Sequence, residues 1–150
     1  MRIVIQRVTD ASVSIGGKLK AAIGAGMMVL IGVENGDTEA DALWLAAKTA
    51  SLRIFDDSQG VMNLDIKAVG GEILAISQFT LTASTRKGNR PSYIRAARQP
   101  LSTDLYELYC TELRRLTGTA VPTGTFGADM QVSLTNDGPV TIIIDSKLKE

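Results

Sequence analysis

The run Ser-Gln-Phe-Thr-Leu at residues 77–81 is the first candidate for chemistry in this sequence. It places two hydroxyls, an amide and an aromatic ring directly after the apolar stretch 73–76. The end of a strand is a common place for functional side chains. Main-chain N–H groups that turn outward at such a bend can stabilise a developing oxyanion without a titratable side chain. Ser and Thr at a strand end more often form local hydrogen bonds, so this run alone does not define a site.

The second candidate is the run Asn-Asp-Gly-Pro-Val-Thr at residues 136–141. It lies between an alternating stretch, 129–134, and a β-branched stretch, 140–144. Asp-Gly between two such stretches predicts a hairpin, with Pro139 at the start of the second strand. X-Pro bonds adopt the cis form at low cost, and a cis bond here would turn two successive carbonyls in an unusual direction. Taken alone, the hairpin is the favoured interpretation.

Composition excludes several kinds of catalytic site. The 150 residues include no histidine and one cysteine, so Ser-His-Asp sites, Cys-His sites, disulfides and thiolate zinc sites are ruled out. Cys110 lies in a helical pattern and is predicted to be a small core residue. Residues 24–26, Gly-Ala-Gly, precede a strand instead of opening a helix, so they do not form a nucleotide loop. An enzyme built on this chain would work without the usual pair of nucleophile and base.

Positive charge is concentrated in one segment although the chain is neutral overall. Lys and Arg number 16, as do Asp and Glu, but residues 86–98 hold five cations and no acidic residue. These cations are Arg86, Lys87, Arg90, Arg95 and Arg98. The segment would suit a phosphate backbone, and it would also suit a solvated basic loop. The sequence leaves both interpretations open.

The pattern of apolar residues predicts one domain, residues 1–150, of the α+β class. Strands are expected at 3–8, 27–33 and 72–77, the last continuing after a bend through 78–82, and hairpins at 11–23 and 129–144. Helices are expected from Asp37 or Thr38 to about Arg53, and from Ser102 to a stop at Gly118. This order predicts a curved, mixed, barrel-like β-sheet packed by two long helices and not a doubly wound fold.

The apolar stretches of the chain are too short to span a bilayer, and the first eight residues read as a strand and not as a signal peptide. We therefore expect no membrane association and a cytoplasmic location.

Several short motifs together resemble one known family. Residues 77–81 and 136–141 match the Ser-Gln-Phe-Thr-Leu and Asn-x-Gly-Pro-Val-Thr marks of D-aminoacyl-tRNA deacylases of the bacterial and eukaryotic type. Supporting matches lie at 5–8, 11–13, 24–26, 53–55, 62–64, 90–92 and 128–132, and the likeness extends from about residue 1 to 144. The chain departs from the family at 93–97, which read Tyr-Ile-Arg-Ala-Ala, and residues 145–150 are expected to form a loose tail.

The resemblance implies hydrolysis of the ester between a D-amino acid, or glycine, and the terminal adenosine of tRNA. It implies a homodimer with an active site shared across the subunits. The implied reaction needs no metal or cofactor. The Gly138-Pro139 bond would be cis, and its main-chain carbonyls would exclude an L side chain by steric clash. Arg7 would brace this motif. By the same likeness the opposite wall comprises Ser77, Gln78, Phe79 and Thr80, and the terminal adenine is held by Phe126 and Met130.

The mechanism leaves two routes. An aminoacyl ester is already activated, so an oriented water and an oxyanion contact could suffice. The resemblance implies that the amide region of Phe79 offers this contact and that the ribose 2′-OH of the RNA assists the water. Alternatively Thr80 acts as a nucleophile, but no base that would activate it is visible nearby in the sequence, so we favour the RNA-assisted route. A non-catalytic tRNA-binding module and an esterase for an unrelated small ester are the alternatives in function.

Overall fold

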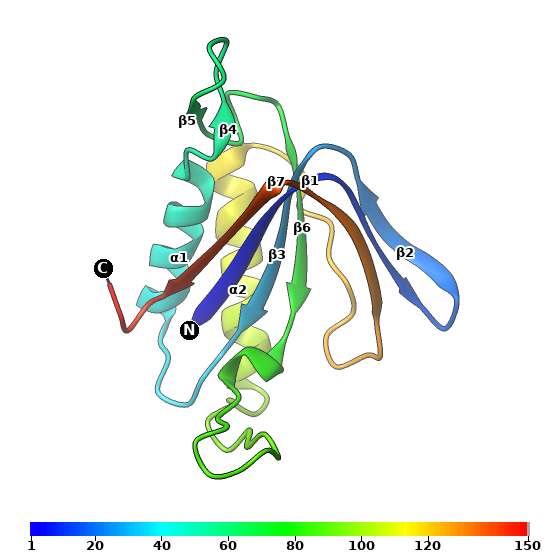
Figure 1. Ribbon diagram of the computed structural model, residues 1–150. Helices are drawn as coiled ribbons and strands as arrows, with labels where there is room; N and C mark the ends of the chain where they lie inside the picture. Colours follow the sequence, from blue (N-terminus) through cyan, green and yellow to red (C-terminus); the bar gives the residue numbers. More distant parts are fainter. Residues whose placement is uncertain (150) are drawn as a thin grey trace.

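A long N-terminal strand organises the sheet. The computed structural model describes residues 1–149 of the chain. The strands around this first one are listed here with their bounds: β1 (Arg2–Ile15), β2 (Lys18–Ile23), β3 (Gly26–Gly32) and β7 (Gln131–Asp145). The first half of β1 pairs with β3 and its second half with β2, while β7 runs antiparallel to both halves of β1. Because one strand changes partners along its length, the sheet curls over at its far end (Figure 1).

The remaining strands complete a mixed sheet. β6 (Glu72–Ser77) pairs in parallel with β3, and the other pairs between named strands described within residues 1–149 are antiparallel. β4 (Phe55–Asp56) and β5 (Met62–Leu64) form a separate two-stranded ribbon. β3 reads as a continuous apolar run because it lies between β1 and β6 with nearly all of its residues buried. The prediction of a curved, mixed sheet in an α+β fold is confirmed.

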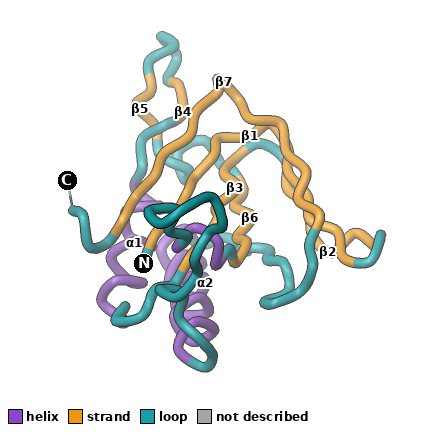
Figure 2. Tube along the Cα trace, turned by 60° about the horizontal axis from the view of Figure 1, so that its bottom comes forward, coloured by secondary structure: helices purple, strands orange, loops and turns teal. Residues whose placement is uncertain are grey.

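Both predicted helices are present, and they lie side by side on one face of the sheet (Figures 1 and 2). α1 (Glu39–Ser51) begins after Thr38, whose N–H and hydroxyl donate to the Asp41 carboxylate at 2.8 and 2.9 Å. α2 (Leu101–Thr117) ends at Gly118, which takes a left-handed φ of 72°. Thr38 and Gly118 are caps as expected. Ser102 is not the cap of α2, because that helix begins one residue earlier, after Pro100.

Two clusters of buried side chains form the core. The larger lies between the helices and the sheet, where Cys110 is buried as predicted, and where the Thr49 and Tyr109 hydroxyls join the two helices at 2.8 Å. The smaller cluster fills the curl of the sheet. Its members are Val8, Ala11, Val13, Ile23, Met28, Leu74 and Ile76. This second cluster lies beside the cavity described below, because Ile76 belongs to both.

The closing hairpin predicted from Asp-Gly is wrong. Residues 131–145 form one strand that continues in the same direction past Gly138-Pro139. Asn136 pairs with Val8 and Thr141 with Gln6, so the four residues 137–140 bulge out opposite Arg7 alone. The turn signal was misleading because both flanking stretches pair with β1 and not with each other.

Two smaller expectations also need correction. Residues after β6 do not continue as a strand but form a short 3₁₀ helix, Phe79–Thr82. The tail expected to be loose is anchored where it leaves β7: Ser146 is buried, and the Lys147 ammonium lies 2.8 Å from the Asp41 carboxylate. Although burial raises it, this contact and the other hydrogen bonds to Asp41 hold the pKa of that carboxyl well below its usual range.

Candidate functional site

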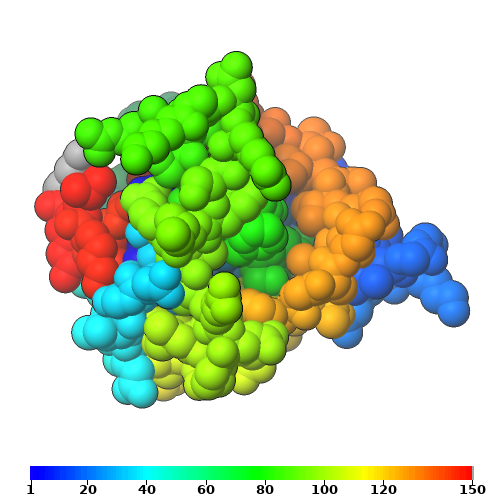
Figure 3. Space-filling view, turned by 90° about the horizontal axis from the view of Figure 1, so that it is seen from below, coloured from blue at the N-terminus to red at the C-terminus, as the bar shows by residue number. Residues whose placement is uncertain are grey.

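A cavity of about 820 Å³ opens at the end of β6. Figure 3 shows its mouth as a hollow between the segment before α2 and the segment before β7. Apolar side chains from β3, β6 and the segment before β7 form much of its lining. Polar side chains also contribute to the lining: Ser77, Gln78, Tyr93, Arg98, Gln99, Ser102 and Asp129. A mostly apolar cavity with a few polar groups is typical of a small-molecule or nucleoside site.

The wall after β6 is positioned by main-chain hydrogen bonds. The Gln78 N–H extends the pairing of β6 with β3 by donating to the Ile31 carbonyl at 2.7 Å. The 3₁₀ helix then packs against Gly32, where a Cβ would lie 2.9 Å from the Leu81 side chain and 3.0 Å from the Gln78 carbonyl. Only glycine allows this close approach. The wall is therefore a rigid extension of the central sheet.

Phe79 opens the 3₁₀ helix at the cavity. Its N–H has no acceptor within the helix, and no hydrogen bond within residues 1–149 uses it. The Phe79 ring is 57 % exposed and contacts Tyr93 edge to face, with 5.0 Å between the ring centroids. This N–H is therefore free to donate to a ligand in the cavity.

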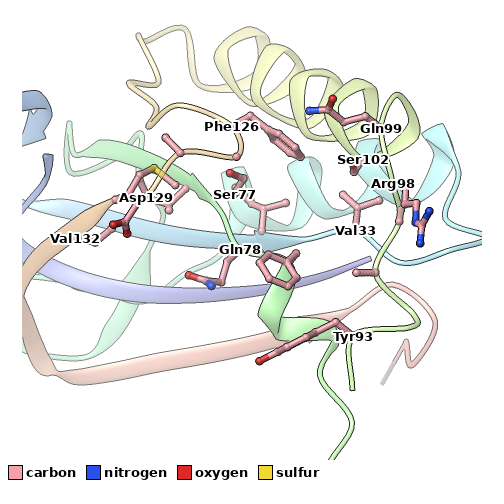
Figure 4. Close-up of a pocket in the computed structure, with 18 residues that line it drawn as sticks. Val33, Ser77, Gln78, Tyr93, Arg98, Gln99, Ser102, Phe126, Asp129 and Val132 are labelled. Atoms are coloured by element: carbon pink, nitrogen blue, oxygen red, sulfur yellow. The ribbon is translucent and has the colours of Figure 1, made fainter. Parts of the chain in front are cut away.

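Thr80 is the one residue of the 77–80 run that does not line the cavity. Its hydroxyl accepts a hydrogen bond from the Gln78 side-chain amide, and therefore stabilises the orientation of a residue that does line it. Ser77, Gln78 and Phe79 all lie on the lining (Figure 4). No carboxylate, thiolate or amine pairs with the Thr80 hydroxyl in the described part of the chain.

Phe126 and Met130 both lie on the cavity lining. Figure 4 shows Phe126 reaching from the segment before β7 to a position next to Ser77. Its ring packs against Tyr106, with 5.7 Å between centroids, and the Tyr106 hydroxyl donates to the Ala75 carbonyl at 3.0 Å. This contact holds the orientation of the Phe126 ring at the cavity.

Gly138 and Pro139 are exposed and do not line the cavity of their own chain. The bond between them is cis. Arg7 stabilises the bulge: its guanidinium donates to the Asp137 carbonyl at 3.2 Å and lies 3.1 Å from the Asp137 carboxylate. It also donates to the Ile54 carbonyl at 2.8 Å and contacts Asp56 at 3.2 Å. The contact between Arg7 and the Gly-Pro segment is thus present.

Some residues at these places were missed by sequence reasoning. Asn136 stabilises the bulge, because its side-chain oxygen accepts a hydrogen bond of 2.9 Å from the Val140 N–H. Ser102 was expected only as a helix cap, yet it is buried on the cavity lining. An Asn before Asp-Gly signals a local hydrogen bond. Nothing in the sequence signals that Ser102 faces a cavity.

Cys110 lies in the core and not on the cavity lining. Burial raises the pKa of the Cys110 thiol to about 11, so it stays protonated and inert near neutral pH. Within residues 1–149 no three His, Cys, Asp or Glu side chains gather in a way that would hold a metal ion. No helix in that range is long and apolar enough to cross a membrane.

Comparison with known proteins agrees with this geometry. The sequence profile of the family described as D-Tyr-tRNA(Tyr) deacylase matches residues 4–145. D-aminoacyl-tRNA deacylases of Bacteroides thetaiotaomicron and Porphyromonas gingivalis are each 59 % identical to the chain over 150 residues, which cover all of both sequences. A solved structure described as c-Myc DNA Unwinding Element Binding Protein superimposes with a TM-score of 0.90 at 38 % identity. That alignment covers 97 % of this chain and 98 % of the other.

These relatives, together with the curved mixed sheet and its two helices, place the chain among hydrolases of the aminoacyl-tRNA deacylase class. The chain belongs to the D-Tyr-tRNA(Tyr) deacylase family.

Proposed function

We propose that the protein hydrolyses the ester between a D-amino acid and the 3′-terminal adenosine of tRNA, and that it spares L-aminoacyl-tRNA. The observation that carries this proposal is the cavity between the 77–79 wall and Phe126 in a chain of this family. The terminal adenine would lie against Phe126 and Met130, with the ester next to Phe79. The cytoplasm, where aminoacyl-tRNA is made and used, is the location that fits this substrate.

The proposed reaction needs no side-chain base. A water oxygen attacks the ester carbonyl carbon, and the unpaired N–H of Phe79 receives the oxyanion that develops. The carbon–oxygen bond to the ribose then breaks, and the ribose oxygen leaves with a proton. The neighbouring 2′-OH of the RNA orients the water, which explains how a site without histidine can work. Ser77 and Gln78 complete the polar side of the wall.

Chiral selection is assigned to Gly138 and Pro139 of a second copy. These residues are exposed and lie outside the cavity of their own chain, so they would act only by entering another cavity. Their carbonyls would leave no room for an L side chain, whereas glycine, which has no side chain, would be accepted. Arg7 would hold them rigid from behind.

A homodimer has a suitable surface on the sheet face away from the helices. Ile143 is 67 % exposed there, and it pairs across β1 with Val4 and Leu30, which are only partly buried. Phe79 and Ile94, which is 83 % exposed, add apolar area near the cavity. Exposed apolar area of this kind is typical of an interface between subunits.

The decisive experiment compares hydrolysis of D-Tyr-tRNA and L-Tyr-tRNA. We expect rapid release of D-tyrosine and little release of L-tyrosine. Tight binding of both without hydrolysis would favour the non-catalytic module, and hydrolysis of simple esters that lack RNA would favour the unrelated esterase.

Subunit complementation tests the shared site. A Phe79→Pro variant, which has no main-chain N–H at that position, and a Gly138→Val variant should each be inactive as homodimers. Mixed after unfolding and refolding, they should regain about one quarter of wild-type activity, because half of the dimers are mixed and each mixed dimer has one intact site of two. A mixture as inactive as its parents would contradict a site built from both subunits.

A further inference from the structure

The structure divides the basic segment 86–98 into cations with different environments. Arg95 is engaged within the chain: its guanidinium lies 3.6 Å from the Glu34 carboxylate and donates to the Thr82 carbonyl at 3.2 Å. Arg98 is exposed, and its guanidinium makes no ion pair or hydrogen bond with any residue in 1–149. Arg95 therefore holds the segment against the body of the protein, and Arg98 is free to bind a ligand.

Arg98 lies at the edge of the cavity, and its direction identifies what it could bind. It belongs to the lining, but Figure 4 shows its guanidinium pointing outward, away from Phe126 and Ser77. A group bound there would lie just outside the mouth while the rest of the ligand occupied the cavity. A guanidinium without a partner favours an anion with two oxygens, such as a phosphate or carboxylate.

We propose that Arg98 binds the phosphodiester immediately 5′ of the terminal adenosine. This inference rests on the proposed function, because the cavity must hold that adenosine. In an aminoacyl-tRNA the first negative charge outside the nucleoside is this phosphodiester, since the amino acid is esterified at the ribose. The contact would be a charge-assisted hydrogen bond that adds to the affinity for the RNA end.

The neighbouring loop extends the same positive surface. Ser84 and Ser92 pair through two main-chain hydrogen bonds of 2.9 Å, which close the loop at its base. Arg86, Lys87 and Arg90 lie on it, and all three are exposed. Figure 3 shows this loop on the rim of the hollow. The remaining nucleotides of the single-stranded 3′ end would pass from Arg98 along this loop.

A series of D-tyrosyl esters that differ only in phosphate tests the proposal. The substrates are the ester of adenosine, which has no phosphodiester, the ester of cytidylyl-(3′→5′)-adenosine, which has one, and D-Tyr-tRNA. Arg98→Ala should raise KM by about tenfold for the last two and leave KM for the adenosine ester unchanged, with kcat similar throughout. Arg98→Lys should recover part of the loss, since it restores the charge but not the two-pronged geometry.

Lys67→Ala is the matched control. Lys67 is exposed in the turn before β6, at the other end of that strand, so its removal lowers the charge equally without altering the mouth. It should leave KM unchanged for all three esters. Thermal unfolding of both variants should match that of the wild type, because neither side chain makes an ion pair within residues 1–149.

Binding of uncharged tRNA, followed by fluorescence at several salt concentrations, separates this inference from the proposed function. Arg98→Ala should reduce the slope of log K against log salt by about the amount that one phosphate contact contributes. Lys67→Ala should leave this slope unchanged. An equal rise in KM for the adenosine ester, or no rise for any ester, would overturn the inference. If the wild type hydrolysed no ester but lost tRNA affinity on Arg98→Ala, the proposed function would fail and the phosphate contact would stand.

Discussion

The cavity wall at 77–80 and the bulge at 137–140 present main-chain groups by opposite means. The wall continues a buried parallel strand and is held by main-chain hydrogen bonds, such as that from Gln78 to Ile31. The bulge is exposed and interrupts the pairing of β7 with β1, and side chains hold it, chiefly those of Arg7 and Asn136. The wall should therefore tolerate loss of a single side chain, and the bulge should not.

Arg7→Ala should show the largest effect. The substitution removes every guanidinium contact to the bulge and leaves the buried Ile54 carbonyl without its donor. We expect a loss of about 2 kcal/mol in the free energy of unfolding, since hydrogen bonds from a charged group are lost. Deacylation of D-Tyr-tRNA should fall by about a hundredfold, because displaced carbonyls no longer shape the site. Denaturant unfolding and initial rates measure the two effects.

Gln6→Ala, one residue earlier on β1, is the control for Arg7. Gln6 reaches only the exposed Thr141 hydroxyl, at 3.4 Å, so stability and rate should barely change. Equal behaviour of the two variants would show that Arg7 does not stabilise the bulge.

Gly138→Ala should have the next largest effect. Gly138 has a φ of 118°, and a Cβ there would lie 2.9 Å from a Val140 methyl and 3.0 Å from the Arg7 guanidinium. Forcing an L side chain into this backbone costs about 1–3 kcal/mol. The bulge should move, and the preference for D-Tyr-tRNA over L-Tyr-tRNA should fall about tenfold, equivalent to about 1.4 kcal/mol.

Gly16→Ala separates local strain from loss of the site. Gly16 also has a positive φ, 56°, but a Cβ there meets no atom within 4 Å. This variant should lose some stability while keeping full chiral preference, measured as the ratio of D to L hydrolysis rates. A similar loss of preference in both variants would contradict the role given to the bulge.

Thr80→Ala tests the wall and should have a small effect. The hydroxyl lies off the cavity and accepts one hydrogen bond, from the Gln78 amide. Its loss should lower kcat by less than about tenfold, since a neutral hydrogen bond contributes about 0.5–1.5 kcal/mol. A fall in kcat of several orders of magnitude, with tRNA binding and folding intact, would instead revive the covalent route in which Thr80 is the nucleophile. A substrate ending in 2′-deoxyadenosine should instead be hydrolysed slowly.

A chelator should leave the deacylation activity unchanged. The chain has no histidine and one buried cysteine, so neither the wall nor the bulge offers soft metal ligands. Activity on D-Tyr-tRNA, measured before and after dialysis against a chelator, should agree within error. A loss that added zinc or magnesium restored would contradict the metal-free mechanism.

Sequence patterns were most successful where local rules decide the structure. Thr38 and Gly118 mark the ends of helices because their capping chemistry is local. Gly16-Gly17 marks a true hairpin, since both residues have a positive φ and the flanking strands pair with each other. Cys110 was placed in the core because its helical register was clear.

Features that depend on contacts between distant residues could not be predicted from local patterns in the sequence. Asp137-Gly138 has the same local signal as a hairpin, and only the partner strand reveals that it is a bulge. The contact from Arg7 to Asp137 spans 130 positions, so it came from family likeness and not from spacing. The difference between Arg95 and Arg98 could not be predicted either, because it depends on where Glu34 lies in the fold.

The pairing of β1 with β7 has a consequence for how the protein is made. Residues 2–14 must wait for residues 131–145 to be synthesised before one edge of β1 is covered. At ordinary translation speeds that interval is on the order of ten seconds. During it the nascent chain carries an open strand edge with alternating apolar residues, which is a template for wrong pairing. The last strand to leave the ribosome, β7, thus covers β1 and places the Gly-Pro bulge against Arg7. A chain truncated before β7 would leave this edge of β1 exposed permanently.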